Sequence, residues 1–274
     1  MIVVESAGMT DIGKHRKVNE DALFTDDDLG LYVVADGVGG HQSGEIASSL
    51  VVETMSRCMK RFNNGGNSEE FINPDPTLSN MANSLISSIQ LANQDVHNSA
   101  TSRKDYQGMG STVSAIYFTD ETLIAANVGD SPIYLIRDGA IDLLSVPHTM
   151  LYDQAFIDPD GTMKMKDTYK HVLTRAIGTK QTVTADVCEI QRFAGDIVVI
   201  CSDGLSDKLC PEEISDIVVN KRPNLACRYL IDLANERGGN DNITVIVLRL
   251  NNIIKKKSVI TRFISRILGK GVHI

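Results

Sequence analysis

Four strand-like runs of apolar residues each meet a single aspartate beside glycine or another turn residue. In three of them the aspartate follows the run, and in the fourth it comes just before the run. The aspartates are Asp36 in LYVVADGVGG, Asp130 in LIAANVGDS, Asp203 in IVVICSDGLSD and Asp241 in GGNDNITVIVLRL. If these strand ends meet at one rim of a sheet, several carboxylates converge there. This pattern constrains the fold more than any other feature of the chain.

Converging carboxylates need a counter-charge, because like charges repel and raise one another's pKa. Hard divalent cations such as Mg²⁺ and Mn²⁺ supply it and prefer oxygen ligands. A glycine after an aspartate also lets a backbone carbonyl approach a metal ion. The alternative is that each aspartate belongs to an ordinary turn. Spacing alone leaves the metal cluster and the turns as equal alternatives.

The order of the predicted elements favours mainly antiparallel sheets with helices packed outside. Runs rich in Val, Ile and Tyr predict strands at 31–35, 112–118, 122–128, 132–137, 196–201 and 243–250. Apolar residues at helical spacing and helix-start signals predict helices at 44–62, 77–98, 211–220 and 223–236. Strict strand–helix alternation is missing from this order. We therefore expect one α+β domain over residues 1–250.

The middle of the chain contains one clear turn and one weakly patterned stretch. Asp138-Gly139, within IRDGAI, predicts a hairpin turn. Residues 140–172 have weak periodicity, which predicts an irregular insertion over a surface. Such loops often serve function.

A charged segment, KHRKVNEDALF at 14–24, lies just ahead of the first of these apolar strands and contains Arg16, Glu20 and Asp21. A charge run of this kind is usually a solvated face. The alternative is an anion-binding guanidinium near a metal-binding carboxylate, since the planar fork of arginine binds two phosphate oxygens at once. The residues alone leave both alternatives open.

The composition limits the class of protein and its partners. The formal net charge of −8 on 274 residues disfavours general nucleic-acid binding. No stretch approaches the ~20 apolar residues of a membrane span, and the N-terminus lacks the pattern of a signal peptide. Five cysteines without a Cys-x-x-Cys pair argue against a zinc site or a disulfide framework. They favour a reducing compartment, so we expect a cytoplasmic protein.

The C-terminal residues 251–274 are predicted to form a basic tail. The final 25 residues carry six Lys and Arg and no acid, so the preceding residues carry a net charge of −14. Within 255–270 the apolar residues make one stripe and the basic residues lie largely opposite, which predicts an amphipathic helix. Such a helix can lie on an anionic membrane surface, such as the inner face of the cell membrane, or dock a partner. The alternative is packing on its own domain or in a dimer.

Seven segments follow one another over about residues 5–250. They are Arg16 with NED at 19–21, ADGVGGHQSGE at 35–45, GMGSTVSAIYF at 108–118, NVGDSPIYLIRDG at 127–139, LTRAIG at 173–178, CSDGLSD at 201–207 and GGNDNITVIV at 238–247. In this order they resemble the metal-dependent, type 2C (PPM) family of Ser/Thr protein phosphatases. Val38 stands where many animal members have a histidine, which resembles the bacterial branch.

The resemblance implies a four-layer α-β-β-α sandwich with a two-metal site. Asp36 would bridge two Mn²⁺ or Mg²⁺ ions, and the carbonyl of Gly37 would help to hold one of them. The other implied ligands are Asp21, Asp203 and Asp241, with Glu20 and Asn242 just outside them. A third, weaker metal site would lie at Asp130 and Asp203, and Arg16 would clamp the phosphate.

The resemblance also implies a reaction and partners. A water activated by two metals would attack the phosphorus of phosphoserine or phosphothreonine, with Arg16 and Asp36 as catalytic residues. The implied partners are phosphorylated proteins and a Ser/Thr kinase whose action the enzyme reverses. Val38 cannot act as a general acid, so the proton donor to the leaving group is unassigned. Residues 140–172 would form the family's flap beside the active site.

Overall fold

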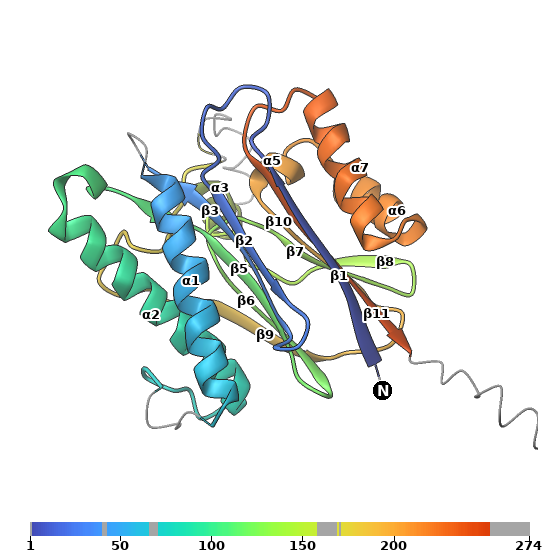
Figure 1. Ribbon diagram of the computed structural model, residues 1–274, viewed down its shortest axis with the longest axis horizontal. Helices are drawn as coiled ribbons and strands as arrows, with labels where there is room; N and C mark the ends of the chain where they lie inside the picture. The colour runs from blue at the N-terminus through green and yellow to red at the C-terminus, as the bar shows by residue number, and fades with distance from the viewer. Residues whose placement is uncertain (1, 40–42, 66–70, 158–168, 170, 253–274) are drawn as a thin grey trace, which may run out of the picture.

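The strands form two antiparallel sheets that face each other (Figure 1). The computed structural model describes residues 2–39, 43–65, 71–157, 169 and 171–252. The first sheet has the order β1-β11-β10-β7-β8, with β1 Ile2–Asp11, β7 Ile133–Arg137, β8 Ala140–Leu143, β10 Ile197–Cys201 and β11 Ile243–Asn252. The second has the order β2-β3-β5-β6-β9, with β2 Asp21–Asp26, β3 Leu31–Val38, β5 Val113–Phe118, β6 Thr122–Val128 and β9 Asp186–Gln191. A short strand, β4 (Gly110–Ser111), also pairs with β3.

Helices cover the outer face of each sheet (Figure 1). The second sheet packs against α1 (Gly44–Asn63) and α2 (Asn80–Ser102). The first sheet packs against α6 (Pro211–Asn220) and α7 (Pro223–Glu236). The shorter helices are α3 (Met150–Ile157), α5 (Asp203–Ser206) and the 3₁₀ turn η2 (Lys104–Tyr106). The predicted α-β-β-α order and the four predicted helices are confirmed.

Strand alternation in β3 brings a carboxylate between the sheets. Leu31 and Val33 pack in the cluster beneath α1 and α2, whereas Tyr32 and Val34 pack in the cluster between the two sheets. Because successive side chains of a strand point to opposite faces, Asp36 continues the side of Tyr32 and Val34. The strand therefore places Asp36 at the end of the layer between the sheets.

The layer between the sheets changes from apolar to polar along its length. Its apolar part consists of Tyr32, Val34, Ile116, Phe118, Leu123, Ala125, Ile133, Leu135, Val198, Ile200, Ile246, Leu248 and Leu250. Ser202 follows β10 on the same face as Ile200, and Thr244 in β11 lies on the same face as Ile246. Both polar residues are buried at the end where Asp36 lies.

The sequence patterns miss the strands at the sheet edges. The edge strands are β1, β8, β2 and β9. Of these, only β8 was implied, by the predicted hairpin turn, and the other three were not expected as strands. Their residues are mostly half-buried or exposed, whereas β5, β7 and β10 are almost entirely buried. An edge strand therefore carries no continuous apolar run, which is the signal that identified the central strands.

The hairpin at Asp138-Gly139 is confirmed. Both residues have positive φ, 52° for Asp138 and 83° for Gly139, as a two-residue hairpin turn of type I′ requires. The turn pairs Arg137 with Ala140 and folds β8 back onto β7. The expectation that 140–172 is irregular throughout is therefore wrong, because the segment begins with β8 and contains α3.

Two further expectations concern the C-terminal tail and the membrane. The strand β11 extends through Asn252, and residues 253–274, with the predicted amphipathic helix, lie outside the described residues. Across the residues that the structure describes, no helix combines the length and apolar character of a membrane span.

Candidate metal centre

A pocket of about 240 Å³ lies at the polar end of the two sheets. Its lining residues are Arg16, Glu20, Asp36, Gly37, Val38, Gly39, Thr112, Asp130, His171, Leu173, Asp203, Asp241 and Asn242. The structure thus brings every predicted site residue except Asp21 to one pocket. Asp21 itself is buried next to them, with 8% of its surface exposed.

Asp21 and Asp36 lie directly opposite each other in the pairing of β2 with β3. Like charges in this position destabilise a sheet. The Asp21 Oδ2 atom accepts hydrogen bonds from Ser202 Oγ at 2.8 Å and from Thr244 Oγ1 at 2.6 Å. Its Oδ1 atom is buried and has no hydrogen-bond partner among the described residues. A buried oxygen without a partner is costly, so this atom is suited to a ligand.

Three aspartates, Asp36, Asp21 and Asp130, have raised pKa values. Burial raises the pKa of Asp36 well above its usual range, and the charges of the neighbouring aspartates raise it further. Burial also raises the pKa of Asp21 to about 6, although its two hydroxyl hydrogen bonds act in the opposite direction. Burial and the charge of Asp203 raise the pKa of Asp130 to about 7. A divalent cation would remove this penalty on the charged forms.

Close backbone contacts place Asp203 and Asp36 at the pocket. Asp203 is the first residue of α5, and a Cβ atom on the following Gly204 would lie 2.0 Å from the carbonyl oxygen of Asn242. A Cβ atom on Gly37 would lie 2.2 Å from the carbonyl oxygen of Gly44. Only glycine fits at these two positions, so each glycine lets the adjoining aspartate approach the shared pocket.

The loop between β1 and β2 carries Arg16 and Glu20 to the same pocket. The Arg16 Nη2 atom lies 2.6 Å from Asp241 Oδ2, and Arg16 Nη1 lies 3.8 Å from Glu20 Oε2. The side chain of Arg16 is 45% exposed. The guanidinium is therefore anchored to the acidic cluster and accessible to an anion in the pocket.

Asn242 holds this loop in place with its whole side-chain amide. Its Oδ1 accepts a hydrogen bond from the Glu20 backbone N–H at 2.8 Å. Its Nδ2 donates to the carbonyl oxygens of Ile12, at 2.9 Å, and Val18, at 3.1 Å. These bonds tie the start of β11 to the segment that contains Arg16.

His171 belongs to the pocket, and sequence reasoning missed it. Its Nδ1 lies 3.4 Å from Asp203 Oδ2, and its Nε2 lies 3.2 Å from Asp207 Oδ2. Single ligand atoms of Asp130, His171 and Asp203 all lie within 4.8 Å of one another, which suits one metal ion. His171 comes from the weakly patterned segment 140–172, where nothing in the local sequence marks it as a ligand.

The donor set fits hard divalent cations. Carboxylate oxygens of Asp21, Asp36, Asp203 and Asp241 dominate it. Among the described lining residues, His171 is the only histidine and there is no cysteine. Mg²⁺ and Mn²⁺ prefer such oxygen-rich sites. The buried Oδ1 of Asp21 and the raised pKa values of the cluster support the same fit.

A family model described as protein phosphatase 2C matches residues 13–232. The chain belongs to the protein phosphatase 2C family. A Listeria welshimeri protein named serine/threonine phosphatase stp is 31% identical over 250 residues, which cover 88% of this chain and 94% of that protein.

Solved structures of the protein phosphatase 2C family agree with this fold. The Mycobacterium tuberculosis serine/threonine phosphatase PstP/Ppp has a TM-score of 0.77 and 27% identity, covering 91% of this chain and 100% of that chain. The PstP catalytic domain in complex with two manganese ions has a TM-score of 0.77 and 28% identity, covering 92% and 100%. The predicted family, its bacterial branch and the fold class are confirmed, and the manganese complex agrees with metal dependence of the family.

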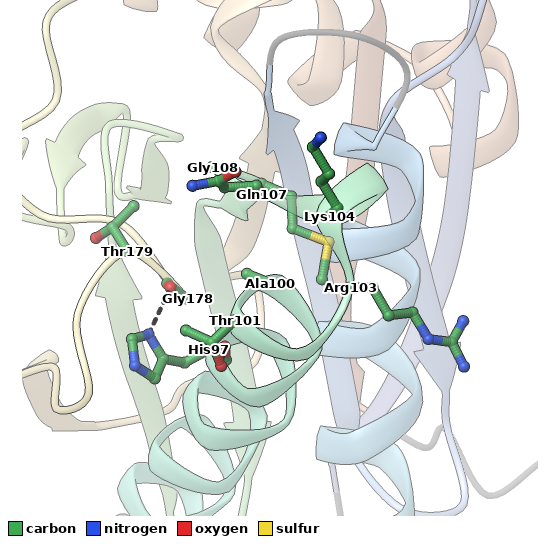
Figure 2. Close-up of a pocket in the computed structure, with 10 residues that line it drawn as sticks. His97, Ala100, Thr101, Arg103, Lys104, Gln107, Gly108, Gly178 and Thr179 are labelled. Carbon is green, nitrogen blue, oxygen red and sulfur yellow. Dashed lines mark hydrogen bonds between the residues drawn. The ribbon is translucent and has the colours of Figure 1, made fainter.

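A second pocket, of about 540 Å³, lies at the C-terminal end of α2 (Figure 2). His97 Nδ1 lies 3.0 Å from the carbonyl oxygen of Gly178 there. Figure 2 shows the guanidinium of Arg103 directed away from His97 and Thr179, so it does not converge with these two polar side chains. The acidic pocket is therefore the candidate active site of this protein phosphatase 2C member.

The acidic cluster predicts how stability depends on pH without metals. The pKa values of Asp21 and Asp130 in the folded chain, about 6 and about 7, lie above the unfolded values near 4. The folded chain therefore binds more protons, and its free energy of unfolding in EDTA should fall by roughly 1–3 kcal/mol as the pH rises from about 4 to about 7. Urea unfolding at about pH 4 and about pH 7 measures this change.

The variant Asp21→Asn tests this explanation, and Asp232→Asn, at an exposed position on α7, is its control. Asp21→Asn should flatten the pH dependence in EDTA and stabilise the metal-free chain at the higher pH, whereas Asp232→Asn should change neither. Saturating Mn²⁺ should remove most of the loss in the wild type. Equal pH slopes for the wild type and Asp21→Asn would contradict the raised pKa of Asp21 in the folded chain.

Proposed function

We propose that this protein hydrolyses phosphoserine and phosphothreonine in proteins and so reverses the action of a Ser/Thr kinase. The observation that carries the proposal is the buried pair of Asp21 and Asp36, with an unpartnered oxygen on Asp21, beside Asp203 and Asp241. Its membership of the protein phosphatase 2C family and the names of its bacterial relatives support the same reaction.

The proposed metal ligands are arranged around one central residue, Asp36. Asp36 would hold both divalent cations, and the Gly37 carbonyl oxygen would help to hold one of them. The further ligands are Asp21, Asp203 and Asp241, while Glu20 and Asn242 support them from outside. When bound, two divalent cations lower the pKa of a water molecule and offset negative charge on the phosphoryl oxygens. The relative crystallised with two manganese ions supports Mn²⁺, and the oxygen-rich donor set also suits Mg²⁺.

Arg16 orients the phosphate in this proposal. Its guanidinium lines the pocket and is partly exposed, while its bond to Asp241 fixes where it lies. A guanidinium binds two phosphoryl oxygens in a planar fork and offsets the charge that develops on them. Val38 also lines the pocket and offers no proton, so the leaving group takes its proton from another group.

A third, weaker cation is proposed at Asp130 and Asp203. The sequence comparison implied the two carboxylates, and the geometry adds His171 as a nitrogen donor on the flap side. A nitrogen donor favours Mn²⁺ over Mg²⁺, because Mg²⁺ binds almost solely through oxygen. This side of the pocket should therefore distinguish the two metals more than the Asp21–Asp36 side does.

The proposed partners are phosphoproteins, their kinase and no nucleic acid. The net charge of −8 disfavours a polyanion as partner. All five cysteines are free thiols, which supports a reducing, cytoplasmic location. The tail at 255–270 lies outside the described residues, and we propose from its sequence that it contacts an anionic membrane surface.

One assay tests the reaction against two rivals. Hydrolysis of p-nitrophenyl phosphate and of a phosphothreonine peptide should require Mn²⁺, stop with EDTA and fall by more than about 100-fold in Asp203→Asn, because a metal ligand is lost. Asp232→Asn on α7 serves as the matched control and should keep full activity. A module that only binds phosphoprotein would show peptide binding without turnover. A purely structural metal domain would show neither, and metal-independent turnover would refute the mechanism.

Liposome co-sedimentation tests the proposed tail contact. The full chain should pellet with vesicles containing anionic lipid and remain in solution with neutral vesicles, since the tail contains six basic residues and no acidic ones. A chain ending at Asn252 should stay in solution with both. Equal pelleting by the two chains would remove the membrane contact.

A further inference from the structure

His148 lies between the turn that carries Asp130 and the base of the flap. The backbone N–H of His148 donates to the carbonyl oxygen of Gly129 at 3.0 Å. In return, the backbone N–H of Gly129 donates to His148 Nδ1 at 3.0 Å. Only 1% of the His148 surface is exposed. The backbone and the ring of His148 thus bind both the carbonyl oxygen and the N–H of Gly129, the residue before Asp130.

These bonds fix the tautomer of the His148 ring. Because the Gly129 N–H is a donor, Nδ1 must accept and carries no proton. The ring proton is therefore on Nε2, which donates to Asp186 Oδ2. The same Asp186 oxygen accepts from Arg175 Nη1 at 2.6 Å. Burial lowers the pKa of His148, which supports the neutral ring that this network needs.

The Gly129–Asp130 turn is held from its other side by Thr112. A Cβ atom on Gly129, whose φ is 107°, would lie 2.6 Å from Thr112 Cβ. Thr112 Oγ1 in turn accepts a hydrogen bond from the backbone N–H of Asp36 at 3.0 Å. The turn is thus confined between His148 and a residue bound to Asp36, so a change at His148 is transmitted to Asp130 itself.

His148 also joins the two ends of the flap. Its carbonyl oxygen accepts a hydrogen bond from the Thr174 backbone N–H at 2.9 Å. The next residue, Thr149, forms an isolated β-bridge with Leu173, and Leu173 lines the acidic pocket. One residue therefore connects the flap base, the pocket wall and the turn before Asp130.

We infer that His148 is a positioning residue that holds Asp130 and the flap base in the geometry needed to bind a divalent cation on that side of the pocket. Its contribution to turnover rests on the proposed function, whereas its contribution to cation binding does not. Among the described residues, no hydrogen bond joins His148 to a carboxylate that lines the acidic pocket, so it acts through Gly129.

Two variants separate the two hydrogen bonds of the ring. In His148→Asn the side-chain oxygen can occupy the place of Nδ1 and still accept from Gly129. In His148→Gln the amide reaches the place of Nε2, so the bond to Asp186 can persist while the acceptor for Gly129 is lost. Mn²⁺ titrations followed by electron paramagnetic resonance measure binding without any turnover.

The inference predicts opposite results for the two variants. One class of Mn²⁺ sites should be absent from Asp130→Asn. His148→Gln should lower the Mn²⁺ affinity of that class by about 10-fold or more, whereas His148→Asn should keep this affinity within about threefold of the wild type. In the Asp130→Asn background, His148→Gln should have no further effect on Mn²⁺ affinity. Unchanged Mn²⁺ affinity in both variants, or an undiminished effect in that background, would overturn the inference.

A measurement on the wild type does not depend on the variants' folding. Long-range ¹H–¹⁵N spectra of the histidine rings should show His148 as the Nε2–H tautomer, and Mg²⁺ should shift the Gly129 amide. An Nδ1–H tautomer would overturn the inference. His148-dependent Mn²⁺ binding without phosphatase activity would refute only the proposed function, and phosphatase activity with His148-independent Mn²⁺ binding would refute only the inference.

Discussion

The opposition of Asp21 and Asp36 across β2 and β3 is the constraint on which the rest of the site depends. Two carboxylates directly opposite each other in a sheet repel, and here both are turned toward the closed layer between the sheets. Thr244 and Ser202 bind one oxygen of Asp21, and the other oxygen has no partner among the described residues. Protonation relieves this repulsion at low pH, and a bound divalent cation would relieve it at neutral pH. The proposed metal site and the stability of this end of the sheets therefore depend on the same pair of carboxylates.

Close backbone contacts and side-chain hydrogen bonds position the segments around Asp21 and Asp36. Gly37 and Gly204 permit contacts with neighbouring carbonyl groups that a Cβ atom would block, and each adjoins an aspartate of the cluster. Asn242 ties the loop bearing Arg16 to β11. His148 plays the corresponding part on the opposite side, where it holds the turn before Asp130. The rim is thus shaped by contacts between segments far apart in the chain.

The central part of the fold could be predicted from the sequence, and the edges could not. Central strands such as β10 are buried on both faces and give continuous apolar runs, whereas the edge strands β1, β2, β8 and β9 give mixed patterns. Asp21 starts an edge strand, so the residues alone left its proposed metal-binding role open beside a solvated charge run, and only the resemblance to a known family favoured that role. His171 and His148 act through partners distant in sequence, and no local periodicity encodes such contacts.

Crystals grown with saturating Mn²⁺ and measured near the manganese absorption edge test the central claim most directly. We predict two strong anomalous peaks beside the Asp36 carboxylate, with Asp21, Asp203 and Asp241 among their ligands. A weaker peak should lie between Asp130 and Asp203. An anomalous map without peaks between Asp36 and its neighbouring carboxylates, at a Mn²⁺ concentration that supports full activity, would contradict the claim.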